Sequence, residues 1–245
     1  MALTLIGLGL FDENDLSLRA VEEAKNSDKV YIENYTGKWH GNLSNLENLV
    51  GKKIIQLERK DLEDDSNKII QESKAKSISI FVQGDPLIAT THSALILEAR
   101  KAGVETKIIH NASIFSAIGE TGLHVYKFGP TVTISFPERA KGKLSKSIFE
   151  TIEENKKRGL HTLCLLDVLA ENDKYMTPKE AVEILLKGKV VTAKDKAVVF
   201  GKAGSDKPHI EYTIAEEVKS QDTPSVIIIP GKLHFSENEF LESLG

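Results

Sequence analysis

Cysteine is nearly absent from this chain, in which Cys164 is the only one among 245 residues. A disulfide within the chain is therefore impossible. Proteins without disulfides are typical of a reducing cytoplasm, where we expect this one to reside. Cys164 lies in the apolar run 163–166, which favours a buried structural thiol over an exposed nucleophile.

Long hydrophobic runs and an excess of positive charge are also missing. No segment reaches the ~20 consecutive apolar residues that a membrane-spanning helix needs, and the N-terminus has no charged leader. We therefore expect neither a membrane partner nor a signal peptide. The formal net charge of −4 argues against a protein that binds nucleic acid directly. The seven histidines show no metal-ligand spacing, so no bound metal is expected.

The first half of the chain has a regular alternation of strand-like and helix-like segments. Apolar runs predict strands at residues 3–8, 30–35, 53–57, 78–82 and 104–109. The apolar spacing between them predicts helices at residues 15–26 with Asp15 as N-cap, 66–73, and 91–102 closed by Gly103. This alternation predicts an α/β fold with a mostly parallel, doubly wound sheet.

In the second half, strands follow one another more directly. They are expected at residues 131–136, 160–168, 197–202, 210–213 and 226–229. One helix is expected at residues 144–158, and another begins at Pro178, where Thr177 and Glu180 form a capping box. The pattern predicts a second α/β domain with a mixed sheet. We place the two domains at residues 1–112 and 113–245.

A Gly-Asp-Pro turn at residues 84–86 follows the predicted strand 78–82. In open α/β folds, small ligands bind at the carboxyl ends of the strands, so Asp85 is a candidate ligand contact. The alternative is that its carboxylate only satisfies backbone N–H groups of the turn. The residues that follow are interpreted as structural: one of Thr90 and Thr91 caps the next helix, and His92 packs or hydrogen-bonds locally.

A second turn, Gly7-Leu8-Gly9, ends the first predicted strand. Dinucleotide-binding folds have a third glycine three residues later, but Asp12 stands there, which weakens that interpretation. The two glycines either form a tight turn or let a ligand approach the backbone closely. No catalytic triad, Cys-His pair or pair of carboxylates is recognisable, so no catalytic residue is assigned. This pattern favours group transfer from an activated cofactor.

Several segments carry a family resemblance. Residues 6–10 and 12–17 resemble the opening of the tetrapyrrole-methylase-like class of S-adenosylmethionine-dependent methyltransferases, and the stretch GDPLIATTH at residues 84–92 narrows this to the diphthine synthase family. The chain is similar to that family in further segments, at residues 113–119, 121–129, 158–163, 175–177, 203–205 and 230–234. The resemblance covers nearly the whole chain, in order.

The resemblance implies a homodimer of two-domain α/β subunits, with S-adenosylmethionine bound in a cleft between the domains and S-adenosylhomocysteine as its product. By motif position, it implies that the cofactor contacts Leu10, Asp85, Ile88, Ser113, Ile114, Leu166, Ala203 and Ser225. The implied protein substrate is translation elongation factor 2, on a histidine that already bears a 3-amino-3-carboxypropyl group. Methylation of its amino group gives diphthine in diphthamide biosynthesis. The compact chain resembles the archaeal type, which stops at the trimethylated amine.

Other functions remain open at this point. A tetrapyrrole C-methyltransferase acting on a precorrin or uroporphyrinogen shares the fold, but it needs a pocket for a polyanionic macrocycle, and the chain has only five arginines. The Gly7-Leu8-Gly9 turn suggests a nicotinamide-dependent oxidoreductase as a second alternative. A non-catalytic adaptor is the third. No general base is identifiable. Lys127, Lys232 and His234 are candidates for pairing with the carboxylate of the substrate.

Overall fold

The computed structural model describes residues 1–140 and 145–244, and the chain forms two compact units, Met1–Ser116 and Ala117–Gly245. The first unit contains a five-stranded sheet in the order β3-β2-β4-β1-β5, in which every neighbouring pair is parallel. Its strands are β1 (Ala2–Gly7), β2 (Lys29–Glu33), β3 (Ile54–Leu57), β4 (Ile78–Val82) and β5 (Glu105–Ile109). The predicted parallel sheet is confirmed.

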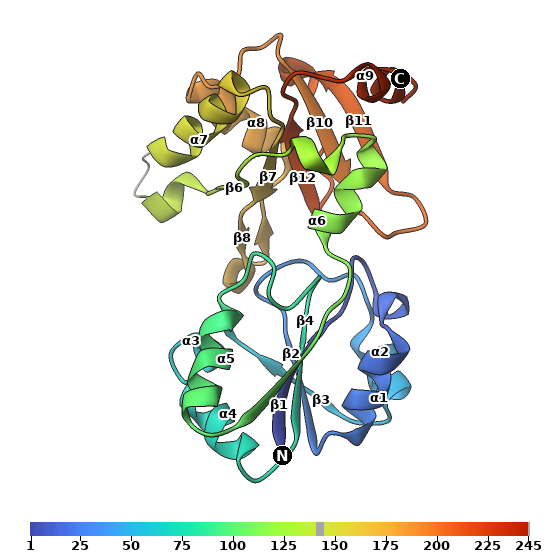
Figure 1. Ribbon diagram of the computed structural model, residues 1–245, viewed down its shortest axis with the longest axis vertical. Helices are drawn as coiled ribbons and strands as arrows, with labels where there is room; N and C mark the ends of the chain where they lie inside the picture. The colour runs from blue at the N-terminus through green and yellow to red at the C-terminus, as the bar shows by residue number, and fades with distance from the viewer. Residues whose placement is uncertain (141–144, 245) are drawn as a thin grey trace. The chain divides into compact units, whose positions relative to one another are not determined.

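Helices cover both faces of this sheet, as expected for a doubly wound fold (Figure 1). On one face lie α1 (Leu18–Asn26) and α2 (Leu43–Val50), and on the other lie α3 (Arg59–Glu63), α4 (Ser66–Ser73) and α5 (His92–Lys101). Every residue of the central strands β1 and β4 is buried, because both faces are covered. This burial explains why the two strands are recognisable as nearly continuous apolar runs, in which Thr4 and Ser79 are the polar members.

The second unit contains a mixed sheet in the order β11-β10-β12-β7-β6. Its strands are β6 (Val132–Ile134), β7 (Thr162–Leu166), β10 (Lys196–Gly201), β11 (His209–Ile214) and β12 (Ser225–Ile229). The β6–β7 pair is parallel and the other pairs are antiparallel, so the predicted mixed sheet is confirmed. A separate antiparallel pair is formed by β8 (Val168–Leu169) and β9 (Lys174–Tyr175).

The core of the second unit joins this sheet to α7 (Lys146–Lys157) and α8 (Pro178–Lys187). Ile152 from α7 and Leu185 from α8 are fully buried in the same cluster as Cys164, so the expected structural thiol is confirmed. The capping box that Thr177 and Glu180 form at the start of α8 is also confirmed. Two further helices are α6 (Ile114–Ala117) and α9 (Phe235–Glu242). Within the described ranges, no helix is long and apolar enough to cross a membrane.

The predicted start of the first helix is wrong. The N-cap of α1 is Ser17, whose hydroxyl accepts a hydrogen bond from Ala20 N at 3.1 Å. Asp15 belongs instead to the short 3-10 helix Glu13–Asp15, and its carboxylate accepts from Phe11 N at 2.6 Å. The helices α2, α3 and α9 were not predicted. Residue 144, the expected first residue of the helix that the structure shows as α7, lies outside the described ranges.

Candidate active site

The carboxyl ends of β4, β1 and β5, which are neighbours in the sheet, form one polar edge of the first unit. The loops after β1 and β4 are joined directly: Gly9 N donates to Gly84 O at 3.2 Å, and Gly84 N donates to Gly9 O at 2.9 Å. Gly9 has a φ of +90°, and a Cβ on Gly7 would lie 2.5 Å from Gly84 O. The tight-turn interpretation therefore accounts for both glycines through the packing of the chain on itself.

Asn111 fixes the third loop, which follows β5. Its side-chain Nδ2 donates to Gly7 O and to Asp15 O, both at 3.0 Å. The three strand-end loops are therefore bonded to one another before any ligand arrives, as a site with a preformed shape requires. This role of Asn111 depends on contacts with residues about 100 positions earlier and has no local signature in the sequence.

Asp85 follows β4 at this edge and has a side chain that is 8% exposed. Its Oδ1 accepts from Leu87 N at 3.0 Å, and its Oδ2 accepts from His110 Nδ1 at 2.7 Å and from Asn111 N at 3.3 Å. The turn-stabilising alternative is thus realised. A carboxylate has about four acceptor positions, so these three bonds leave room for one more donor. Asp85 can serve the turn and a ligand together.

His92, which is 2% exposed, stabilises the Gly-Asp-Pro turn by a hydrogen bond to its last residue. Its ring bonds to Pro86 O through Nδ1 at 3.2 Å and to the Tyr35 hydroxyl through Nε2 at 3.3 Å. A carbonyl oxygen only accepts, so Nδ1 carries the proton and Tyr35 donates to Nε2. Burial, reinforced by Glu33, raises the pKa of Tyr35, which keeps this donor protonated. The predicted local role of His92 is confirmed.

The remaining candidates in the first unit surround the same turn. Ile88 leaves 39% of its surface exposed, and the next residue, Ala89, has a φ of +56°, a strained conformation for a residue with a side chain. Ser113 is 8% exposed, and a Cβ on Gly84 would lie 3.5 Å from its Cβ. No hydrogen bond found among the described residues uses the Ser113 hydroxyl. Leu10 follows β1 and Ile114 begins α6, so all five candidates lie beyond the carboxyl ends of β1, β4 and β5.

The three candidates in the second unit lie at strand ends on one side of the mixed sheet. Leu166 is the last residue of β7, Ala203 follows β10, and Ser225 begins β12. The strand register pairs Gly201 with Ser225 and Leu165 with Val226, which brings the three positions together. The hydroxyl of Ser225 donates to Asp222 O at 2.6 Å, so its proton is already used within the loop. Ala203 is 9% exposed.

Two of the residues considered for the substrate carboxylate have structural partners instead. Lys127 Nζ pairs with the fully buried carboxylate of Glu237 and donates to Lys232 O at 2.6 Å. His234 caps α9, and its Nδ1 hydrogen-bonds the Ser236 hydroxyl at 2.8 Å. Lys127 and His234 therefore hold structural positions, whereas Lys232 is exposed, and the pairing of these residues with a substrate carboxylate stays a prediction.

Glu237 is the centre of this network. Burial favours its neutral form, but the His234 backbone N–H, Lys127, the His124 backbone N–H and His161 together lower the pKa of Glu237 to about 2. Burial lowers the pKa of His161, which bonds Glu237 Oε1 through Nε2 at 3.1 Å and accepts from Gly231 N through Nδ1 at 2.9 Å. A neutral histidine protonated on Nε2 satisfies both bonds. The network thus fixes α9 and the loop after β12.

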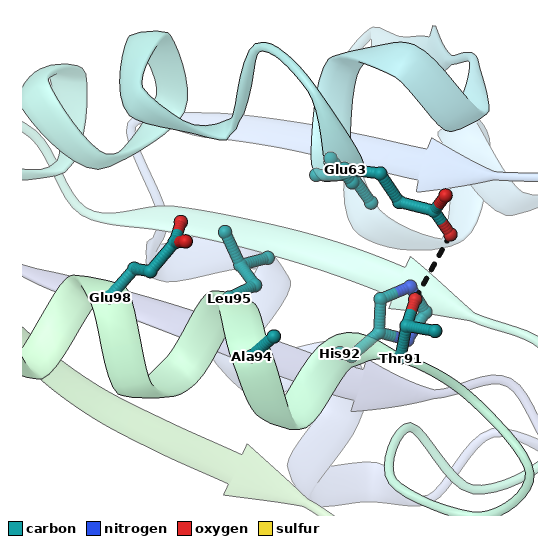
Figure 2. Close-up of a pocket in the computed structure, with 7 residues that line it drawn as sticks. Glu63, Thr91, His92, Ala94, Leu95 and Glu98 are labelled. Atoms are coloured by element: carbon teal, nitrogen blue, oxygen red, sulfur yellow. Dashed lines mark hydrogen bonds between the residues drawn. The ribbon is translucent and has the colours of Figure 1, made fainter.

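A pocket of about 260 Å³ lies between α3 and α5 in the first unit. Figure 2 shows Glu98 and Leu95 of α5 beside it, with Thr91 donating to Glu63 at 3.0 Å. The volume is below the ~300–1,000 Å³ of typical ligand pockets. The pocket also lies beside the helices that cover the sheet rather than among the strand-end loops. It is therefore not assigned to the cofactor.

His110, the partner of Asp85, was not among the residues predicted from the sequence. It follows β5 directly, and 68% of its side chain is exposed. The available signal was a polar residue immediately after a predicted strand. Pairing His110 with Asp85 also requires the strand order, which places β5 and β4 on either side of β1.

Comparison with known proteins agrees with this arrangement. Residues 2–219 match the family model of the tetrapyrrole (corrin/porphyrin) methylases, so the sheets and their strand-end loops are those of a methyltransferase of this class. The match speaks against the nicotinamide-dependent alternative.

Individual relatives narrow the family. The diphthine synthase of Methanocaldococcus jannaschii is 44% identical over 99% of this chain and 98% of its own length, and that of Methanococcus maripaludis strain C6 is 41% identical over the same shares. A diphthine synthase crystal structure superposes with a TM-score of 0.92 at 38% identity, covering 100% of this chain and 96% of the other. A putative diphthine synthase from Entamoeba histolytica gives 0.88 at 31% identity, covering 99% and 98%. The chain belongs to the diphthine synthase family, and the tetrapyrrole C-methyltransferase alternative is not favoured.

Proposed function

We propose that this protein transfers methyl groups from S-adenosylmethionine to the amino group of the 3-amino-3-carboxypropyl histidine of translation elongation factor 2, which gives diphthine. Membership of the diphthine synthase family along nearly the whole chain carries this proposal. The strand-end edge of the first unit, with Asp85 held in place and one acceptor position open, supports the same class of chemistry.

The residues at this edge fit the cofactor. The open acceptor position of Asp85 suits a ligand hydroxyl or amine, and the unused hydroxyl of Ser113 lies beside the same turn. The exposed side chain of Ile88 offers an apolar surface for a flat ring. We propose that Leu10, Asp85, Ile88, Ser113 and Ile114 bind the cofactor, together with Leu166, Ala203 and Ser225 of the second unit. We also retain 1–112 and 113–245 as the two folding domains.

The chemistry needs little covalent help from the protein. When bound, S-adenosylmethionine supplies a methyl group on a positively charged sulfur, and S-adenosylhomocysteine leaves as the amine nitrogen forms the new bond to carbon. The residues of the chain orient the reactants and shield them from water, which is sufficient for a large acceleration when the geometry is held closely. The absence of a recognisable nucleophile in the sequence agrees with this direct transfer.

The remaining parts of the proposal follow from the family. We propose three successive methyl additions, a homodimer as the working form, and the cytoplasm as the location, because the elongation factor functions there. We propose no direct contact with nucleic acid and no membrane partner, which the net charge of −4 supports for nucleic acid.

A pair of measurements separates this proposal from its rivals. Thermal-shift titrations with S-adenosylmethionine and with NAD distinguish a methyltransferase from an oxidoreductase, and we expect stabilisation by the first alone. Transfer of labelled methyl groups is then compared between elongation factor 2 with the precursor histidine and uroporphyrinogen. Label on the macrocycle and none on the elongation factor would contradict the proposal. Cofactor binding with no transfer to either would favour the non-catalytic adaptor.

A further inference from the structure

We propose that His110 is a catalytic residue, which accepts a proton from the amino group of the substrate before each methyl transfer. The inference rests on the proposed function. It supplies the general base that the sequence did not reveal.

The reaction requires such a group because a protonated amine has no lone pair to attack with. Amines of this kind have pKa values of about 8 to 10 and are mostly protonated near neutral pH. Each step breaks one N–H bond of the ammonium group and forms one N–H bond on the acceptor nitrogen, which returns the proton to water. The first two transfers each give a methylated ammonium ion that must lose another proton. Three methyl additions therefore require three proton transfers.

The geometry of His110 suits this role. Its Nδ1 lies 2.7 Å from Asp85 Oδ2. A carboxylate accepts only, so in the neutral imidazole Nδ1 carries the proton and the lone pair is on Nε2. Asp85 is itself fixed by Leu87 N and Asn111 N, so the orientation of the imidazole is set by a buried group. A carboxylate that holds an imidazole in one tautomer is a recurrent arrangement for a general base.

The exposure of His110 makes its free ring nitrogen accessible. Its side chain is 68% exposed, so Nε2 can meet a substrate and exchange protons with water. Asp85, its partner, is also the proposed cofactor contact, which places the base beside the proposed methyl donor. Imidazole is the side chain best matched to proton transfer near neutral pH.

Three other titratable groups near this edge have partners of their own. His92 uses both ring nitrogens, Asp15 accepts from Phe11 N, and the carboxylate of Glu33 accepts from the backbone N–H groups of Tyr35 and Thr36. Among the described charged groups, Asp85 is the one in contact with His110, at 2.7 Å. Asp85 is already committed as an acceptor, whereas Nε2 of His110 has no hydrogen-bond partner among the described residues.

The alternative is that His110 only holds Asp85 in place, and His110→Asn separates the two roles. The amide nitrogen of asparagine is as many bonds from the backbone as Nδ1 and donates to Asp85, but asparagine cannot take up a proton. The measurement is the single-turnover rate of methyl transfer to elongation factor 2 carrying the precursor histidine, from pH 6 to pH 10. The affinity for S-adenosylmethionine is measured in parallel by calorimetry.

We expect His110→Asn to slow transfer about 100-fold or more at pH 7. Its affinity for the cofactor should remain within about twofold, and its rate should recover towards pH 10 as the amine loses its proton to water. His110→Ala, with added imidazole, should recover part of its rate. His40→Asn, which removes another imidazole from a loop of the same sheet, should change the rate less than about twofold.

A wild-type rate and pH profile in His110→Asn would overturn the inference and leave the proposed function intact. A rate loss matched by an equal loss of cofactor affinity would assign His110 to holding Asp85, which also overturns it. If wild-type protein adds no methyl group to the elongation factor, the proposed function fails first, and the inference fails with it.

Discussion

Asp85→Asn is the substitution that tests the strand-end site most directly. It keeps the size of the side chain and removes its charge. The side-chain oxygen of the asparagine can still accept from Leu87 N, as Oδ1 of Asp85 does. The amide nitrogen takes the place of Oδ2, the atom that accepts from His110 and Asn111 N in the wild type. His110 can adapt by moving its proton to Nε2, so that Nδ1 accepts from the amide. The bond to Asn111 N, already long at 3.3 Å, is lost.

The magnitudes follow from these contacts. Loss of one long backbone hydrogen bond, with the imidazole free to adapt, should lower the free energy of unfolding by about 1 kcal/mol. A hydrogen bond from the cofactor to a charged carboxylate contributes about 1.5–3 kcal/mol. The affinity for S-adenosylmethionine should therefore fall about 10- to 150-fold. The effect on binding should exceed the effect on folding.

The assay is isothermal calorimetry with S-adenosylmethionine, paired with urea denaturation of the free protein. Asp85→Ala is the companion variant. It leaves all three donors without an acceptor and should cost about 2–4 kcal/mol in stability. If Asp85→Asn binds the cofactor within about twofold of wild type while its stability falls, Asp85 serves only the turn, and the assignment of the cofactor to this edge is refuted.

Two further predictions concern stability. Glu237→Gln should lower the free energy of unfolding by about 3–5 kcal/mol, because Lys127 would keep a charge without its buried partner. In wild type, the pKa of Glu237 is lowered from 4.5 to about 2, so its contribution is present above pH 4.5 and is lost as pH falls towards 2. The free energies of unfolding of wild type and variant, measured during acid titration, should therefore converge as the pH falls towards 2. An acid transition in Glu237→Gln that is unchanged from wild type would contradict this role of Glu237. Gly9→Ala should destabilise more than Gly51→Ala in urea: both have positive φ, but only Gly9 would place a Cβ 2.4 Å from Asp15 Cβ. Equal losses would refute the close-packing explanation.

Much of the first sheet could be predicted because its central strands are covered on both faces. Burial on two sides favours apolar residues along the whole strand, and such runs, interrupted only by Thr4 and Ser79, are visible in the sequence at β1 and β4. The short helix α3 (Arg59–Glu63) was missed because four of its five residues are charged and it shows no apolar period. The start of α1 was misplaced because Asp15 and Ser17 are both good N-cap residues. Only the structure shows that Asp15 is bound to Phe11 N.

The site was predictable only where one segment contains the whole signal. The Gly-Asp-Pro turn stands next to its strand, so Asp85 was identifiable. Its bond to His110 joins residues 25 apart and depends on the order in which β4, β1 and β5 assemble. The residues around Lys127 in the sequence do not indicate a buried ion pair, because its carboxylate partner Glu237 lies 110 residues later. Pairings of this kind are decided by the tertiary fold and have no local signature.

The proposal that this protein is a diphthine-forming methyltransferase is tested most directly by intact-mass analysis of its protein substrate. Elongation factor 2 carrying the 3-amino-3-carboxypropyl histidine is incubated with the protein and S-adenosylmethionine, and its mass is followed over time. We expect stepwise addition of methyl groups that ends at three, all on the modified histidine. A substrate whose mass stays unchanged, with a protein that still binds the cofactor, would contradict it.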